Sequence, residues 1–125
     1  MGKKILIADD KASMRKLIKA SLKLEGGQFE IYEAQSGEDA LEMARKIKPQ
    51  LLILDVMMPG MSGYEVCKNL KDSSETKDIY VLFLTGLESV LAKENVEICG
   101  GDDFLCKPFS LKEFEQKVKK VMGSA

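Results

Sequence analysis

The sequence contains no histidine and no tryptophan. Without histidine there can be no imidazole metal site, no catalytic dyad with an imidazole base and no phosphohistidine within the chain. Any chemistry carried out by this protein must therefore use carboxylates, lysine and hydroxyl groups.

Cysteine is also scarce, with three residues at positions 67, 99 and 106. Their number is odd, they share no metal-ligand spacing, and each lies within an apolar pattern. We therefore expect free, buried thiols in a reducing compartment, and neither a disulfide framework nor a zinc site.

Long apolar runs are missing as well. No run approaches the ~20 residues that span a bilayer, and the N-terminus lacks the apolar core of a signal peptide. A net charge of −1 gives no bulk electrostatic reason to expect direct binding to nucleic acid or to a membrane. We expect a cytoplasmic protein whose 125 residues form a single domain, residues 1–125.

Short apolar runs alternate with helical periodicity along the chain. Strands are expected at residues 4–8, 29–34, 51–55, 79–84 and 103–106, and helices at residues 11–24, 36–47, 62–70, 88–98 and 110–122. Two helix starts have capping-box spacing, Ser36 with Asp39 and Ser62 with Glu65. The alternation predicts an α/β fold of right-handed βαβ units, with one doubly wound five-stranded parallel sheet and helices on both faces.

Reactive side chains stand where these strands end. The carboxyl ends of four strands are followed or closed by Asp9, Asp10, Asp55, Thr85 and Lys107. Open α/β folds place their ligands at this edge of the sheet, so we expect these side chains to meet in one crevice. Carboxylates about 4 Å apart repel by roughly 4 kcal/mol at a near-surface effective dielectric. Three acids in one crevice therefore predict a bound cation.

A second acidic pair, Asp102-Asp103, precedes its strand instead of following it. This order predicts that the pair lies at the amino edge of the sheet, away from the crevice. Its expected role is solvation.

Four segments resemble the motifs of one family: ILIADD at 5–10, LDVMMPGMSG at 54–63, LFLTG at 82–86 and DDFLCKPF at 102–109. In order and spacing, the chain resembles a receiver domain of the response-regulator family of two-component signalling. The resemblance implies a flavodoxin-like (CheY-like) fold with strand order 2-1-3-4-5.

The resemblance also implies roles for the residues of the crevice. Asp55 would accept a phosphoryl group from a phosphohistidine on a sensor histidine kinase or a histidine phosphotransfer protein. Asp10, Asp55 and the backbone carbonyl of Met57 would bind Mg²⁺, with Asp9 in support, and Mn²⁺ could replace Mg²⁺. Lys107 would supply a balancing positive charge.

Two further positions carry the expected switch. Thr85 would bond a phosphoryl oxygen, and Phe104 would rotate into the space that Thr85 leaves, although a phenylalanine that simply packs in the core explains Phe104 as well. The Lys107-Pro108 bond is cis in relatives. Switching would remodel the surface around the fourth helix, fifth strand and last helix, and thereby control an unidentified protein target, with the chain as a monomer or a phosphorylation-dependent dimer.

Three other functions compete with this one. A phosphohydrolase of the haloacid-dehalogenase type needs a second aspartate two residues after the first, where this chain has Met57. A flavin or nucleotide carrier needs a phosphate cradle, which Asp9-Asp10 would repel. A phosphorylation-independent receiver scaffold needs none of the acids. We expect no enzyme in the usual sense, but a stand-alone regulator or a module of a longer one that catalyses only its own phosphorylation and dephosphorylation.

Overall fold

The computed structural model describes residues 3–24 and 29–123. Within these ranges, parallel strands form one sheet in the order β2-β1-β3-β4-β5. The strands are β1 (Lys3–Ala8), β2 (Phe29–Ala34), β3 (Leu51–Asp55), β4 (Tyr80–Thr85) and β5 (Asp103–Cys106). The α/β fold and the strand order predicted from the sequence are confirmed.

A helix follows each strand. These are α1 (Ala12–Leu24), α2 (Gly37–Ile47), α3 (Gly63–Lys71), α4 (Ser89–Cys99) and α5 (Leu111–Met122). The side chain of Ser36 accepts a hydrogen bond from the Asp39 N–H, and Ser62 forms a complete capping box with Glu65, as their spacing predicts. Helix α4 has no side-chain cap. Its weaker signal explains why the expected range of 88–98 lies one residue early.

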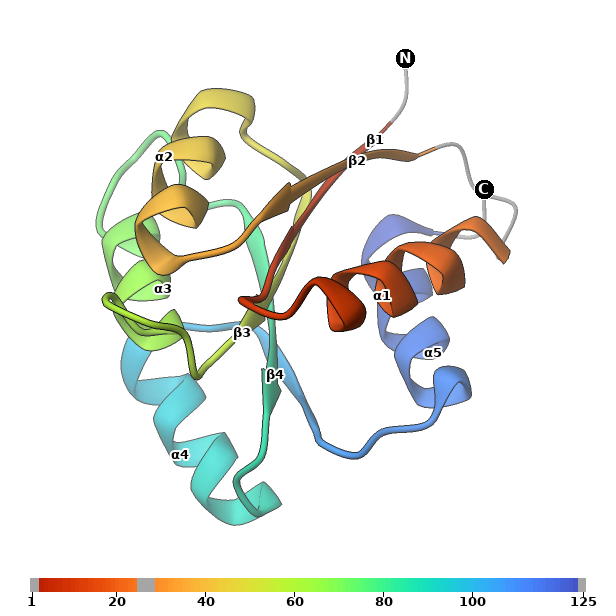
Figure 1. Ribbon diagram of the computed structural model, residues 1–125. Coiled ribbons are helices and arrows are strands. Elements are labelled where there is room, and N and C mark those ends of the chain that lie inside the picture. Colours follow the sequence, from red (N-terminus) through yellow and green to blue (C-terminus); the bar gives the residue numbers. More distant parts are fainter. Residues whose placement is uncertain (1–2, 25–28, 124–125) are drawn as a thin grey trace.

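Helices cover both faces of the sheet, with α1 and α5 on one side and α2, α3 and α4 on the other (Figure 1). Strand residues alternate between the two layers. One layer packs against Ile5, Ile7, Leu51, Ile53, Leu82 and Leu84, and the other against Leu6, Leu52, Leu54, Val81 and Phe83. The central strands β1, β3 and β4 are apolar on both faces, which is why they read as continuous apolar runs in the sequence.

All three cysteines are free. Cys67 and Cys99 are buried where α3 packs against α4, whereas Cys106 is only half-buried, so the expectation of burial is wrong for Cys106. The contact of Cys67 with Cys99, together with burial, raises the pKa of the Cys67 thiol well above its usual value. That shift keeps Cys67 protonated and unreactive.

The helices of residues 3–24 and 29–123 are each too short or too polar to traverse a lipid bilayer.

Candidate functional site

Strand register brings the predicted site residues to one edge of the sheet. Ala8 of β1 pairs with Leu54 of β3, so the residues that follow, Asp9 and Asp55, emerge side by side. On the other flank, Thr85 at the end of β4 pairs with Cys106, and Lys107 continues from β5. The parallel arrangement therefore gathers side chains from four separate parts of the sequence.

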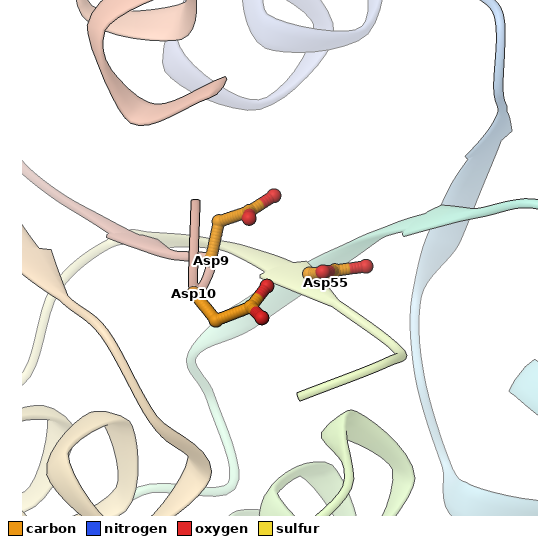
Figure 2. Close-up of side chains that lie close together, drawn as sticks. All are labelled: Asp9, Asp10 and Asp55. Atoms are coloured by element: carbon orange, nitrogen blue, oxygen red, sulfur yellow. The ribbon is translucent and has the colours of Figure 1, made fainter. Parts of the chain in front are cut away.

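The three acids of this edge form one cluster, which we call the acidic crevice: Asp9, Asp10 and Asp55. One carboxylate oxygen from each lies within 4.8 Å of the other two. The side chains emerge from the adjacent ends of β1 and β3 (Figure 2). Asp9 and Asp55 are buried, with 0% and 3% of their surface exposed, whereas Asp10 is open to solvent. A ligand can therefore approach from the side of Asp10.

The carboxylate of Asp9 is only partly paired. Its Oδ1 accepts a hydrogen bond from the Lys11 N–H at 2.9 Å, but its buried Oδ2 has no hydrogen-bond partner among the described residues. Burial raises the pKa of Asp9, and repulsion from Asp55 and Asp10 adds to this rise. A buried carboxylate oxygen without a partner is costly, and a cation bound at this oxygen would offset that cost.

Asp55 is held by two donors. Its Oδ1 accepts a hydrogen bond from the Met57 N–H at 3.3 Å and forms an ion pair with Lys107 Nζ at 3.2 Å. Gly63 lets the start of α3 approach the end of this strand, because a Cβ at Gly63 would lie 2.4 Å from the Asp55 carbonyl oxygen. The acid is therefore oriented by backbone on one side and by an ammonium group on the other.

Thr85 lies beside this cluster with its side chain buried. Its Oγ1 accepts a hydrogen bond from the Leu87 N–H at 3.1 Å, which forms a small turn at the start of the β4–α4 loop. Its carbonyl accepts a hydrogen bond from the Lys107 N–H at 2.6 Å. Thr85 and Lys107 are thereby fixed to each other through the backbone.

The other predicted residues are placed as follows. The side chain of Met57 is 77% exposed, so it leaves the mouth of the crevice open. Phe104 is half-buried and packs against the layer formed by α2, α3 and α4. The Lys107-Pro108 peptide bond is cis, as the resemblance implies.

The expectation for Asp102-Asp103 is wrong in one respect. The pair does lie at the start of β5, outside the acidic crevice, but its role is not solvation. Asp102 Oδ2 accepts hydrogen bonds from the Val81 N–H and from Lys71 Nζ, both at 2.8 Å. Asp103 Oδ1 accepts from the Phe104 N–H and from Lys117 Nζ. These acids join helices to strand ends, because partners from distant segments converge on them in the fold.

Arg15 is a site residue that the sequence pattern did not reveal. Its Nη1 donates to the Asp9 carbonyl at 2.7 Å, and its Nε pairs with Glu33 Oε1 at 3.0 Å. The guanidinium thus fixes the backbone that carries the first two acids. No local signal marks Arg15, since one partner is a carbonyl group and the other lies 18 residues away.

The donor set of the crevice fits a small divalent cation. Within residues 3–24 and 29–123, three carboxylates oppose a single lysine ammonium, and the buried Oδ2 of Asp9 lacks a partner. Oxygen donors of this kind select hard cations such as Mg²⁺ or Mn²⁺. The residues present are therefore suited to hold such an ion.

Comparison with known proteins decides the family. Residues 5–119 match the family described as response regulator receiver domain. The chain belongs to this family. It is a receiver domain of two-component signalling, homologous to receiver domains of response regulators and of histidine kinases.

The receiver domain is similar to proteins from diverse organisms. It is 40% identical, over 98% of its length, to the probable transcriptional regulator ycf27 of Porphyra purpurea. A putative response regulator from Chloroflexus aurantiacus has 34% identity and a TM-score of 0.89, with 98% of each chain covered. The chemotaxis protein CheY4 of Vibrio cholerae has 30% identity and a TM-score of 0.86, with 97% of this chain and 99% of that chain covered. The chain spans about half the length of the ycf27 relatives, 48% in the Porphyra protein.

Proposed function

We propose that this receiver domain is a switch that accepts a phosphoryl group on Asp55 in a cation-dependent reaction. The observation that carries the proposal is the acidic crevice itself. It combines an oriented carboxylate, a lysine at 3.2 Å and a neighbouring acid whose buried oxygen has no partner among the described residues. Stability alone does not require this arrangement.

The donor would be a phosphohistidine on a sensor histidine kinase or a histidine phosphotransfer protein. A carboxylate oxygen of Asp55 attacks phosphorus, the P–N bond breaks, and its electron pair returns to the imidazole, which takes a proton from water. The product is an aspartyl phosphate. Water later attacks phosphorus, which releases inorganic phosphate and restores the carboxylate. Because the donor is made with ATP, we propose a cytoplasmic site of action.

The residues around Asp55 would prepare it for this reaction. The ligands for Mg²⁺, or for Mn²⁺ in its place, would come from Asp10, Asp55, the Met57 carbonyl and, in support, Asp9. When bound, the ion supplies positive charge against the phosphoryl oxygens. Lys107 would release its ion pair with Asp55 and bind a phosphoryl oxygen. Its positive charge would then stabilise the negative charge of the phosphoryl group.

Thr85 would respond to phosphorylation of Asp55. Its hydroxyl lies at the end of β4 and accepts a hydrogen bond from the Leu87 N–H. A phosphoryl oxygen offers a charged acceptor, which forms a stronger hydrogen bond than a neutral group does. Movement of Thr85 toward Asp55 would shift an existing equilibrium of the loop and α4. Phe104 would fill the space that Thr85 leaves.

The surface that changes would control a protein target. Helix α4 already exposes apolar side chains, with Val90 71% and Ile98 82% exposed. Such residues are available for a protein contact and give no basis for nucleic-acid binding. We propose that the domain turns over only its own phosphoryl group, because Met57 stands where a phosphohydrolase of the haloacid-dehalogenase type needs a second acid.

Intact-mass analysis tests the proposal. The native domain, incubated with Mg²⁺ and acetyl phosphate, should gain the mass of one phosphoryl group, and Asp55→Asn should gain none. Asp102→Asn is the matched control, because it removes an acid from outside the crevice, and it should gain the same mass as the native chain. No gain in the native domain, or an equal gain in Asp55→Asn, would reject the assignment.

A further inference from the structure

Tyr64, the second residue of α3, has a hydroxyl that the proposed mechanism does not use. Its ring packs on Phe83 of β4, with ring centroids 5.3 Å apart and the planes tilted by 52°. The hydroxyl oxygen is sealed from solvent and has no hydrogen-bond partner among the described residues. A phenylalanine would fill the same space without this cost, so the hydroxyl calls for an explanation.

Two polar side chains lie close to this hydroxyl. Burial raises the pKa of the Tyr64 phenol, while the nearby side chains of Thr85 and Asn95 act in the opposite direction. Neither neighbour forms a hydrogen bond of good geometry with the phenol oxygen. Thr85 Oγ1 accepts from the Leu87 N–H, and Asn95 Nδ2 donates to the Leu91 carbonyl at 3.0 Å. The second bond leaves the carbonyl oxygen of Asn95 as a possible acceptor.

The position of Tyr64 links the crevice to α4. Thr85 closes β4 next to Asp55, and Asn95 lies in the middle of α4, which packs beside α3 (Figure 1). Phe104 has no hydroxyl and cannot pass on the movement of Thr85 through a hydrogen bond. Tyr64 carries a hydroxyl where α3, β4 and α4 meet.

We propose that Tyr64 is a positioning residue that couples Thr85 to α4. Its hydroxyl is unpaired in the arrangement described here and donates to Asn95 Oδ1 when Thr85 turns toward a phosphoryl group. The inference rests on the proposed function of Asp55. A hydrogen bond present in only one of two states shifts the equilibrium between them by roughly fivefold.

Tyr64→Phe removes only the hydroxyl and tests this coupling. The rate of amide exchange in α4 should differ between the phosphorylated and the unphosphorylated domain. In the phosphorylated domain, Tyr64→Phe should shift the equilibrium between the two arrangements of α4 back toward the unphosphorylated arrangement by roughly fivefold. Its mass gain with acetyl phosphate should equal that of the native domain. Tyr32→Phe is the control, because the Tyr32 hydroxyl donates to Glu30 on the edge strand β2, and its α4 exchange should match the native domain.

Two measurements separate this role from a purely structural one. Unphosphorylated Tyr64→Phe should be as stable as the native domain or more stable, because it loses an unpaired hydroxyl. In a double-mutant cycle of phosphorylation-dependent exchange, Tyr64→Phe and Asn95→Leu should be non-additive. A destabilised unphosphorylated variant, additive effects, or native α4 exchange in phosphorylated Tyr64→Phe would each overturn the inference. Failure of the native domain to gain mass would instead reject the function of Asp55, and the inference with it.

Discussion

The molecule contains the dipeptide Asp-Asp twice, and the two copies have opposite fates. Asp9-Asp10 follows β1 and enters the acidic crevice, where one buried carboxylate oxygen has no partner among the described residues. Asp102-Asp103 lies at the start of β5, where each side chain accepts a backbone N–H and a lysine ammonium. The same dipeptide is thus fully paired at the start of one strand and incompletely paired at the end of another.

The two acidic pairs differ in how far neighbouring groups compensate their charge. Lys71 Nζ donates to the carbonyls of Lys77 and Ile79 as well as to Asp102, so the second acidic pair belongs to a complete polar network. In the crevice, one lysine faces three acids. Uncompensated charge of this kind is typical of ligand-binding sites.

The largest expected effect is on the rate of phosphorylation and comes from the lysine paired with Asp55, in contrast to the lysine paired with Asp103. Lys107→Ala should lower the rate of phosphorylation of Asp55 by about 10²-fold, the scale for removing a donor that stabilises developing charge. Lys117→Ala removes the partner of Asp103 and should leave that rate unchanged. The rates are measured by intact mass over time with acetyl phosphate. Equal rates in the native domain and Lys107→Ala would remove Lys107 from the mechanism.

The second acidic pair should matter for stability. Asp102→Ala leaves the Val81 N–H without its acceptor and the Lys71 ammonium without its carboxylate partner, and should lower the free energy of unfolding by about 2 kcal/mol. Urea denaturation measures this loss, while phosphorylation of Asp55 should proceed as in the native domain. A variant with native stability would show that the network contributes nothing to the fold.

In the acidic crevice, replacing an acid should raise the free energy of unfolding instead of lowering it. Asp9→Asn removes a buried charge whose pKa is raised by burial and by its neighbouring acids, and should increase the free energy of unfolding without divalent cations by about 1 kcal/mol. The same variant should gain less stability from added Mg²⁺ than the native domain. Thermal denaturation in chelator and in Mg²⁺ measures both effects. Destabilisation in chelator would mean that Asp9 is held for structural reasons.

The smallest effect concerns a third carboxylate that is fully paired. Hydrogen bonds from Lys19 and Arg15 lower the pKa of Glu33 below its ordinary value of 4.5. Its stabilisation is therefore present above pH 4.5 and is lost as the pH falls through the lowered value. Because Glu33 is about a third exposed, Glu33→Gln should cost only about 0.5 kcal/mol. The difference in unfolding free energy should vanish in acid, and a difference that grows in acid would contradict this assignment.

The sequence predicts the fold well because each strand and helix carries its own signal. Strands β1, β3 and β4 are buried on both faces, and Ser36 and Ser62 act as caps where their spacing places them. The meeting of Asp9, Asp10 and Asp55 also follows from sequence, since parallel strands align their carboxyl ends.

Contacts between remote side chains could not be predicted in this way. The bonds from Asp102 to Lys71 and Val81, and from Arg15 to the Asp9 carbonyl, depend on how helices dock on the sheet. The unpaired Tyr64 hydroxyl is likewise invisible in sequence, because an aromatic residue at that helical position predicts only core packing. Local patterns thus specify elements and their ends, whereas partners that meet across the core depend on tertiary packing.

Calorimetric titration of Mg²⁺ into the unphosphorylated domain tests the central claim most directly. The native domain and Asp102→Asn should each bind a single ion, and Asp10→Asn should bind it at least about tenfold more weakly. Absence of Mg²⁺ binding by the native domain, or equal affinity in Asp10→Asn, would contradict the claim that the crevice acids share one cation.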